Sequence, residues 1–382
     1  MKNMTTFLLI VFLMFLFEMF ATGRVYSQTT HAEPKTLEIG SRAPDFHLPG
    51  VDGKIYSLKD FDNTPFLVII FSCDHCPTAQ AYEDRIIALA DDYRTKGVSL
   101  VMISPNSIKA LNYAELGYTD LGDSFEDMKL RAADKGFTFP YLYDGDEQKT
   151  ALAYGPVATP HCFVFDRNRI LQYTGRVDGS EKPGTGKGED VRNAIDALLS
   201  GKGVKNPVTK VFGCSIKWSW KDEYTKRLYK QWSELPVTIE EIDGQGIKNL
   251  ISNSSSGKVR LINIWATWCG PCITEFPDLV IIDRMYRVRP FELITISADK
   301  TAKKADALKF LQGQQASNKN YIFNKDDVYE MIEAIDPAWQ GALPYTLIIE
   351  PGGKIIFKKQ DIIDPLEMKK LIVGSKYIGR YY

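Results

Sequence analysis

The sequence predicts an α/β protein of two domains, each with a central mixed β-sheet flanked by helices. Its 382 residues suit two domains at roughly 150 residues each. A Cys-x-x-Cys pair occurs in each half, at Cys73 and Cys76 and again at Cys269 and Cys272. Each pair follows an apolar, β-branched run and precedes a helix-like stretch, which predicts the same local structure twice.

The first half gives a clear order of elements. Residues 51–54 (Val-Asp-Gly-Lys) have the chemistry of a hairpin turn. Residues 66–71 form an apolar run without polar alternation, as expected of a strand buried on both faces. The remaining predicted elements are a helix over 79–93, a strand over 98–103, helical structure near 118–133, paired strands at 161–165 and 170–173, and a helix over 189–199.

The second half repeats that order, β-α-β-α-β-β-α, without repeating the sequence. The predicted elements are a strand over 259–265, a helix over 273–286 interrupted by Pro277, a strand over 291–296, a helix over 305–312, a hairpin of 345–349 with 354–357, and a closing helix over 365–373.

The N-terminus reads as a targeting segment. Lys2 precedes an apolar run from Phe7 to Phe17, and small residues follow it. We expect residues 1–27 to be a cleaved signal peptide and 28–36 a tether, which would carry the protein across the inner membrane to the periplasm. An N-terminal membrane anchor is the alternative, although Glu18 breaks the run.

Composition excludes some functions. A formal net charge of −1 provides no field for binding nucleic acid. The chain is 44% hydrophobic and 25% charged, as in ordinary soluble proteins. Six cysteines are too few for a disulfide scaffold, and four of them fall in the two short pairs, which indicates redox chemistry or a metal rather than stapling.

The second pair lies in a specific motif. Residues 265–272 read Trp-Ala-Thr-Trp-Cys-Gly-Pro-Cys, followed by Glu275 and Pro277. This segment resembles the secreted thiol–disulfide oxidoreductases of the TlpA/ResA type, within the thioredoxin superfamily. The resemblance covers a predicted domain at residues 237–382.

The first half resembles the AhpC/TSA-related, redoxin-like branch of the same superfamily, over residues 37–218. The matching segments are 40–46 (Gly-Ser-Arg-Ala-Pro-Asp-Phe), 52–53 (Asp-Gly), 73–77 (Cys-Asp-His-Cys-Pro) and 213–217 (Gly-Cys-Ser-Ile-Lys). Residues 219–236 are expected to be a linker helix, because Trp220, Tyr224, Leu228 and Trp232 recur at steps of four.

The resemblance implies a proline with a cis peptide bond facing each cysteine pair. The matching positions are Thr159-Pro160 and Leu343-Pro344, each just before a core strand. Thr159 and Leu343 would then present their backbone to a substrate disulfide.

The implied mechanism is thiol–disulfide exchange. Cys73 and Cys269 are expected to be exposed at a helix N-terminus, where the helix dipole favours the thiolate. Each would form a mixed disulfide with a protein substrate, and a buried Cys76 or Cys272 would resolve it.

Neighbouring residues are expected to tune the pairs. Trp268, Gly270 and Pro271 surround the second pair; Asp74 and His75 lie inside the first. A His75 imidazolium would stabilise a thiolate, and Asp74 would oppose it. Asn263 and Leu67 occupy the place where cytoplasmic thioredoxins carry a buried acid, so neither can transfer that proton. Glu275 is either the acid of the secreted branch or a surface residue.

Three alternatives stay open. The first domain could be a thiol peroxidase, but Ile70 stands where peroxiredoxins have a hydroxyl residue three positions before the attacking cysteine. It could bind or deliver copper through Cys73, Cys76 and His161, since thiolates and imidazole suit Cu(I). One domain could also be an inactive scaffold.

Cys162 and Cys214 remain outside the two pairs. Cys162 reads as a small buried hydrophobe, and a structural Cys162–Cys214 disulfide is a second hypothesis. The sequence implies no cofactor and no resident metal. The expected partners are protein thiols and disulfides, with a membrane electron donor as a candidate for recycling. The direction of electron flow depends on redox potentials that no pattern reveals.

Overall fold

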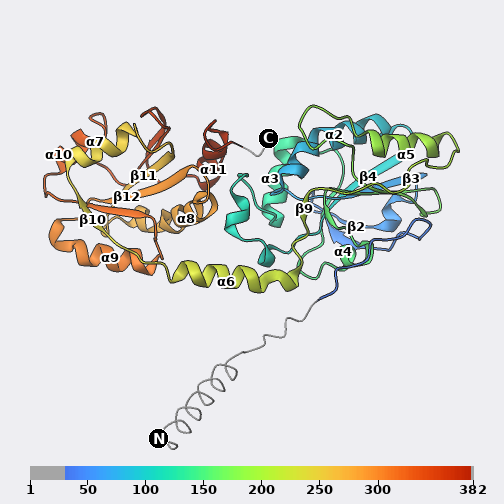
Figure 1. Ribbon diagram of the computed structural model, residues 1–382, viewed down its shortest axis with the longest axis horizontal. Coiled ribbons are helices and arrows are strands. Elements are labelled where there is room, and N and C mark those ends of the chain that lie inside the picture. Colours follow the sequence, from blue (N-terminus) through green and yellow to red (C-terminus); the bar gives the residue numbers. More distant parts are fainter. Residues whose placement is uncertain (1–30, 380–382) are drawn as a thin grey trace, which may run out of the picture. The chain divides into compact units, whose positions relative to one another are not determined.

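A computed structural model describes residues 31–379 of the chain, in which two sheets form the centres of two α/β domains (Figure 1). The first sheet has the order β5-β4-β3-β7-β8. Its strands are β3 (Phe66–Phe71), β4 (Val98–Ser104), β5 (Tyr141–Tyr143), β7 (His161–Phe165) and β8 (Leu171–Gly175). Strands β3, β4 and β5 are parallel, and β7 runs antiparallel to both of its neighbours, β3 and β8.

The second sheet has the order β10-β13-β12-β11-β14-β15, so the five strands from β13 to β15 repeat the arrangement of the first sheet. Its strands are β10 (Glu240–Ile242), β11 (Val259–Trp265), β12 (Phe291–Ser297), β13 (Lys319–Phe323), β14 (Tyr345–Ile349) and β15 (Ile355–Gln360). The predicted mixed α/β architecture is therefore present in both halves, with one parallel strand (β5) in the first sheet and two (β10 and β13) in the second that the sequence did not indicate.

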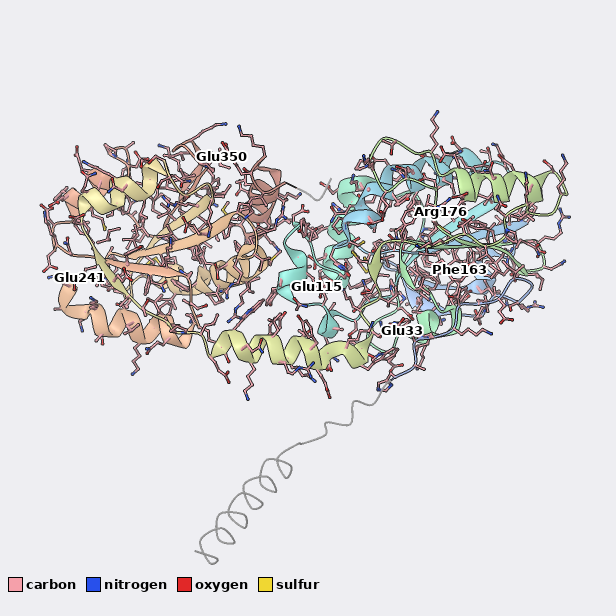
Figure 2. All side chains as sticks on the ribbon, in the orientation of Figure 1. Glu33, Glu115, Phe163, Arg176, Glu241 and Glu350 are labelled. Atoms are coloured by element: carbon pink, nitrogen blue, oxygen red, sulfur yellow. A yellow bond between two sulfur atoms is a disulfide. The ribbon has the colours of Figure 1, made fainter. Side chains whose placement is uncertain are left out.

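Alternate side chains of β3 enter two different cores, as the period of a strand requires. Val68 and Ile70 pack with α2 (Pro77–Arg94), α3 (Phe125–Lys135) and α5 (Glu189–Leu199). Phe71 packs on the other face with Phe163, which Figure 2 labels, and with α4 (Lys149–Tyr154). Every residue of β3 is buried, which explains its unbroken apolar sequence.

The second sheet is covered in the same way. Leu261 and Leu293 pack on one side with α8 (Gly270–Tyr286), α9 (Lys304–Gly313) and α11 (Pro365–Gly374). The opposite face packs with α7 (Gly244–Ser252) and α10 (Val328–Ile335). Helix α8 is continuous through Pro277, so the predicted interruption is wrong. Pro277 lies in the third turn, where the residue four positions earlier is Ile273.

Other predicted bounds need correction as well. The helical structure expected near 118–133 begins only at Phe125, after the N-cap Ser124, whose hydroxyl accepts the Asp127 N–H. Helix α6 (Asp222–Ser233) lies within the expected linker and begins after a short turn that holds Trp220.

Two small sheets complete the first domain. Strands β1 (His47–Pro49) and β2 (Ile55–Ser57) form the predicted hairpin. Strand β9 (Cys214–Ser215) pairs antiparallel with β6 (Ala158–Thr159), so Thr159 lies opposite Cys214. The chain thus returns to the first domain before α6 begins.

The predicted signal peptide, residues 1–27, lies outside the described residues, as does the start of the tether. Within residues 31–379, no helix has both the length and the apolar character needed to cross a membrane.

Candidate active sites

The second cysteine pair is a closed disulfide at the start of a helix. Strand β11 ends at Trp265, α8 begins at Gly270, and Cys269 is the N-cap, bonded to Cys272. The Cys272 N–H donates to Cys269 Sγ over 3.3 Å. An amide at a helix N-terminus directed at Sγ favours negative charge on that sulfur when the bond is reduced.

Exposure at this site differs from the expectation. Cys269 is only 5% exposed, so the prediction of an exposed attacking cysteine is wrong, whereas Cys272 is buried as predicted. The neighbouring Trp268 is 70% exposed. Exposed tryptophan is a residue type enriched at protein contact surfaces.

An aspartate holds the loop that leads to this disulfide. Asp299, just after β12, accepts the Thr267 N–H at 2.9 Å and the Thr267 hydroxyl at 2.7 Å. These bonds fix the chain two residues before Cys269. They leave the amides inside the Cys-x-x-Cys motif free to point at sulfur.

Glu275 is buried one turn after Cys272 on α8, which excludes the surface reading of this residue. Its carboxyl oxygens accept the Asn263 side-chain N–H at 2.8 Å and the Ile363 N–H at 2.9 Å. Burial raises the pKa of Glu275 in spite of these bonds. The site therefore has a carboxyl group with a raised affinity for a proton, although Asn263 occupies the usual position of an acid.

The first pair has a different relation to its helix. Helix α2 begins at Pro77, so the N-cap is Cys76, the second cysteine, and not Cys73. Proline is favoured at the first helical position because it has no N–H to satisfy. Both cysteines are free thiols in the structure, and Cys73 is 3% exposed, which again contradicts the predicted exposure.

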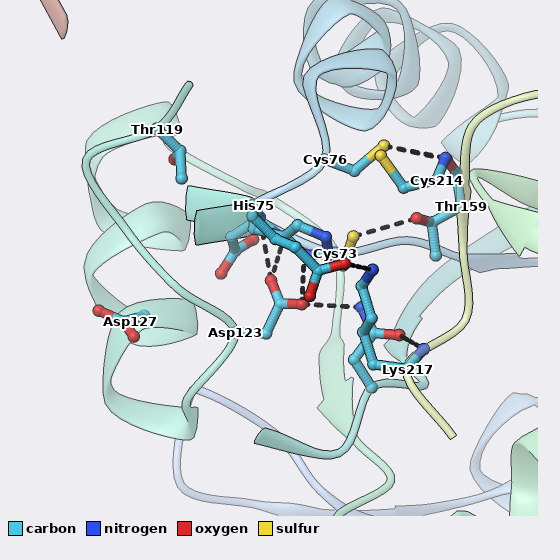
Figure 3. Close-up of polar contacts among 12 residues, drawn as sticks. Cys73, His75, Cys76, Thr119, Asp123, Asp127, Thr159, Cys214 and Lys217 are labelled. Atoms are coloured by element: carbon cyan, nitrogen blue, oxygen red, sulfur yellow. Dashed lines mark hydrogen bonds and ion pairs between the residues drawn. The ribbon is translucent and has the colours of Figure 1, made fainter. Parts of the chain in front are cut away.

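Asp123 makes the hydrogen bonds that distinguish the first site from the second (Figure 3). Its Oδ1 accepts the N–H groups of Asp74 and His75, both at 2.9 Å. Its Oδ2 lies 2.6 Å from His75 Nδ1 and accepts the Asn106 side-chain N–H at 2.7 Å. The amides of Asp74 and His75 therefore stabilise the Asp123 carboxylate.

The two thiols of the first pair consequently have opposite tendencies. Burial, together with hydrogen bonding to Cys76 and the Asp123 charge, raises the pKa of Cys73 well above its ordinary value. Burial also opposes charge on Cys76, but hydrogen bonds from Cys214 and Cys73, the His75 charge and the Ala79 N–H lower its pKa well below the ordinary value. The hydrogen bonds and charges around the pair thus favour a thiolate at Cys76 over the predicted one at Cys73.

His75 and Asp123 form a buried ion pair. Burial by itself would lower the pKa of His75, but the Asp123 carboxylate outweighs it and raises this pKa. The His75 charge in turn overcomes burial and lowers the pKa of Asp123. By linkage, the ion pair stabilises the folded state over a limited range of pH. Its contribution is lost as pH falls through the lowered Asp123 pKa or rises through the raised His75 pKa.

Asp74 opposes the effect of the His75 imidazolium less than the sequence predicted. Burial, and then the nearby Asp123 charge, raise the pKa of Asp74 well above its ordinary value. Its Oδ1 accepts the Tyr141 hydroxyl at 2.9 Å, and the residue is 2% exposed. Asp74 therefore keeps its proton to a higher pH than an ordinary aspartate, which weakens its opposition to the His75 charge.

The Cys162–Cys214 disulfide does not form. Both residues are free thiols and belong to different clusters. Cys162 is buried in the core on β7, between β3 and β8, as the first interpretation of this residue predicted. Cys214 instead lies against the first pair, where its N–H donates to Cys76 Sγ over 3.3 Å.

The copper hypothesis on Cys73, Cys76 and His161 is not supported. His161 Nδ1 accepts the Val157 N–H at 3.2 Å, and Nε2 lies 2.9 Å from the Thr174 hydroxyl. Both ring nitrogens are thereby occupied. Among the described residues, the group with ligand atoms close enough for a metal is Cys73, His75 and Asp123, within 4.8 Å of one another. Two of its members already form the ion pair.

Both predicted prolines have cis peptide bonds, at Thr159-Pro160 and Leu343-Pro344. The Thr159 hydroxyl lies 3.0 Å from Cys73 Sγ. The sequence pattern places such a hydroxyl three residues before Cys73, where this chain has Ile70. It gives no signal for the hydroxyl of Thr159, which is distant in the sequence. It also missed Asp123, for which no local pattern exists, whereas Pro77 gave a usable signal for the start of α2.

Comparison with known proteins agrees with this two-part architecture. Residues 39–174 match the family model described as AhpC/TSA family, and residues 233–370 match the one described as Redoxin. ResA of Bacillus subtilis, a thiol–disulfide oxidoreductase, is 24% identical over 34% of this chain and 68% of its own length. ResA of Oceanobacillus iheyensis is 22% identical over 35% of this chain and 59% of its own length. The chain thus spans about three fifths to two thirds of these relatives.

Solved structures give similar matches. An uncharacterised conserved protein of Geobacillus kaustophilus is 39% identical, with a TM-score of 0.43, over 49% of this chain and 95% of its own. A thiol:disulfide interchange protein of Chlorobium tepidum is 16% identical, with a TM-score of 0.33, over 43% of this chain and 99% of its own.

The repeated fold and the two matched regions identify the chain as a tandem protein of the thioredoxin superfamily. Its first half carries the AhpC/TSA-family region, as the sequence motifs predicted, and its second half carries the Redoxin region.

Proposed function

We propose that this protein is a thiol–disulfide oxidoreductase with two unequal Cys-x-x-Cys centres, acting on protein thiols outside the cytoplasm. The observation that supports it most is the Cys269–Cys272 disulfide at the N-terminus of α8, with an amide donating to Cys269 Sγ. The similarity to ResA proteins supports the same chemistry.

Disulfide exchange at the second domain would take place in two steps. A substrate thiolate attacks Cys269 Sγ, the Cys269–Cys272 bond breaks, and Cys272 leaves as a thiolate. A second substrate thiolate then attacks the substrate sulfur of the mixed disulfide, and Cys269 leaves as a thiolate. The substrate gains a disulfide and the protein gains a dithiol; with a substrate disulfide the same steps run in reverse. Glu275, with its raised pKa, is placed to take up or release a proton in the vicinity of Cys272.

The location and the recycling partner are parts of the same proposal. The apolar N-terminal run from Phe7 to Phe17 supports export to the periplasm, with a membrane anchor as the alternative. A membrane electron donor would then keep the dithiol reduced. Fractionation of cells that express the full chain checks the location: recovery in the cytosol would contradict it.

Insulin reduction with dithiothreitol as electron donor tests the activity. The full chain is expected to accelerate the reaction, and the Cys269→Ser, Cys272→Ser chain is expected to lose most of that acceleration. The Cys73→Ser, Cys76→Ser chain serves as the matched variant and should retain it. Equal rates with and without the wild-type chain would overturn the proposal.

A thiol peroxidase activity of the first domain is the second candidate. The Thr159 hydroxyl, 3.0 Å from Cys73 Sγ, favours it by supplying the hydroxyl that Ile70 lacks. The raised pKa of Cys73 argues against it, because peroxide reacts with the thiolate. Peroxide consumption that requires Cys73, with a sulfenic acid trapped at that residue, would establish this activity.

A further inference from the structure

The first site contains a third thiol that the Cys-x-x-Cys pattern does not include. Cys73, Cys76 and Ala79 form a small buried cluster, and Cys214 packs against it. The Cys214 N–H donates to Cys76 Sγ over 3.3 Å, and the Cys214 thiol is hydrogen-bonded to the same sulfur. Figure 3 shows the side chains of Cys76 and Cys214 next to one another.

The backbone holds Cys214 at this point. Cys214 is the residue of β9 that pairs with Thr159 of β6. Gly213, with φ of +141°, allows the close approach, because a Cβ there would lie 2.0 Å from the Thr159 carbonyl oxygen. Two independent constraints, a strand pairing and a glycine-dependent contact, therefore place the third sulfur beside Cys76.

Cys214 is also the thiol of this cluster that faces outward. Cys73 and Cys76 are 3% and 0% exposed, whereas Cys214 is partly exposed. A cavity of about 370 Å³ is lined by Cys214 together with His75, Pro77, Glu181 and Lys217, among others, but not by the sulfurs of the pair. An external thiol that enters this cavity would meet Cys214 first.

The second domain lacks this arrangement. Among the described residues, no strand pairs with the segment before Pro344 in the way that β9 pairs with β6. Its exposed Trp268 lies next to the disulfide instead. The two sites therefore differ in how an external thiol would reach them.

We propose that Cys214 is a third redox thiol of the first site, which takes over the disulfide from Cys73–Cys76 and presents it at the cavity to an external thiol. This rests on the proposed function of the first pair. In the reduced site, the hydrogen bond to Cys76 and burial raise the pKa of the Cys214 thiol, so Cys214 attacks Cys76 Sγ only after it has lost its proton. The Cys73–Cys76 bond then breaks, and Cys73 leaves as a thiolate that takes up the proton lost by Cys214. One disulfide replaces another, so this step transfers no net electrons.

The external thiol completes the exchange. Its thiolate attacks Cys214 Sγ, the Cys76–Cys214 bond breaks, and Cys76 leaves as a thiolate. A second external thiol then attacks the external sulfur of the mixed disulfide and releases Cys214. The surroundings of Cys76, with the Ala79 N–H, the Cys214 N–H and the His75 charge directed at its sulfur, suit it as the leaving group.

Disulfide mapping after mild oxidation tests the proposal. The full chain is treated with glutathione disulfide, alkylated and digested without reduction. Cys73→Ser is expected to yield the Cys76–Cys214 cross-link, and the wild type a mixture of Cys73–Cys76 and Cys76–Cys214. Cys214→Ser should yield Cys73–Cys76 alone, and Cys269–Cys272 is the internal control. Absence of the Cys76–Cys214 cross-link from both the wild type and Cys73→Ser would overturn the proposal.

Kinetics separate this proposal from the function on which it rests. All chains carry Cys269→Ser and Cys272→Ser, so that only the first site can react. The rate at which glutathione reduces the oxidised first site is measured. Cys214→Ser and Cys214→Ala are the test variants, and Cys162→Ala is the matched control. Circular dichroism checks that each variant folds. A slower reduction in both Cys214 variants, but not in Cys162→Ala, is expected. An unchanged rate would overturn the relay alone, whereas failure of Cys73 and Cys76 ever to form a disulfide would remove the proposed function of the first domain.

Discussion

The two Cys-x-x-Cys sites occupy corresponding places in two similar sheets, yet a different aspartate contacts each of them in a different way. Asp299 holds Thr267, outside its motif, so the amide of Cys272 remains directed at Cys269 Sγ. Asp123 binds the amides of Asp74 and His75 inside its motif, and there the helix begins only after Cys76. The comparison teaches that residues far away in the sequence, and not only the spacing of two cysteines, determine which of them the surroundings favour as a thiolate.

The largest expected effect comes from Asp123→Asn. It removes the partner of a buried imidazolium, and breaking a buried ion pair costs about 3 kcal/mol of unfolding free energy. Urea denaturation of the full chain, followed by a probe in each domain, measures the loss. The matched change Asp299→Asn removes hydrogen bonds but no ion pair, so its cost should be smaller. Equal losses of unfolding free energy in the two variants would contradict the conclusion that Asp123 forms an ion pair and Asp299 does not.

Gly213→Ala should have the next largest effect on stability, because it disturbs the backbone just before strand β9, which carries Cys214 at the first site. The new methyl group would collide with the Thr159 carbonyl oxygen, and strain of this kind costs about 2 kcal/mol. We expect β9 to leave β6, which hydrogen exchange at Cys214 and Ser215 would report as faster. Gly203→Ala is the control, since a Cβ there meets nothing within 4 Å. Unchanged exchange in Gly213→Ala would show that β9 does not depend on this contact.

Glu275→Gln should have a smaller effect, confined to the second domain and dependent on pH. Because the folded-state pKa of Glu275 is raised, its protonated form favours folding, and that contribution is lost as pH rises through the folded pKa. The wild type should therefore lose unfolding free energy relative to Glu275→Gln as pH increases above about 4.3. Denaturation midpoints at several pH values measure this, and parallel profiles would contradict it.

Local patterns in the sequence were sufficient for the elements that position both sites. The apolar run of β3, the helix α5 and both prolines are found where the motifs and periodicity predicted. The start of α2 could also have been predicted, because Pro77 at the first helical position identifies Cys76 as the N-cap.

The remaining features depend on contacts between distant segments. Asp123 lies 47 residues from Cys76 in the sequence, and Cys214 meets Cys76 across 138 residues. A side chain that reaches a motif through tertiary folding leaves no periodic signal, so neither contact could be predicted. Without Asp123 and Cys214, the sequence pointed to a thiolate at Cys73, whereas the surroundings in the fold favour one at Cys76.

The identity of the thiolate in the first site tests the central claim most directly. Absorbance at 240 nm, followed against pH in the Cys269→Ser, Cys272→Ser background, compares Cys73→Ser with Cys76→Ser. We predict that Cys73→Ser retains a thiolate that forms below the ordinary thiol pKa of about 8.5 and that Cys76→Ser loses it. A low-pKa thiolate retained in Cys76→Ser and lost in Cys73→Ser would contradict the account.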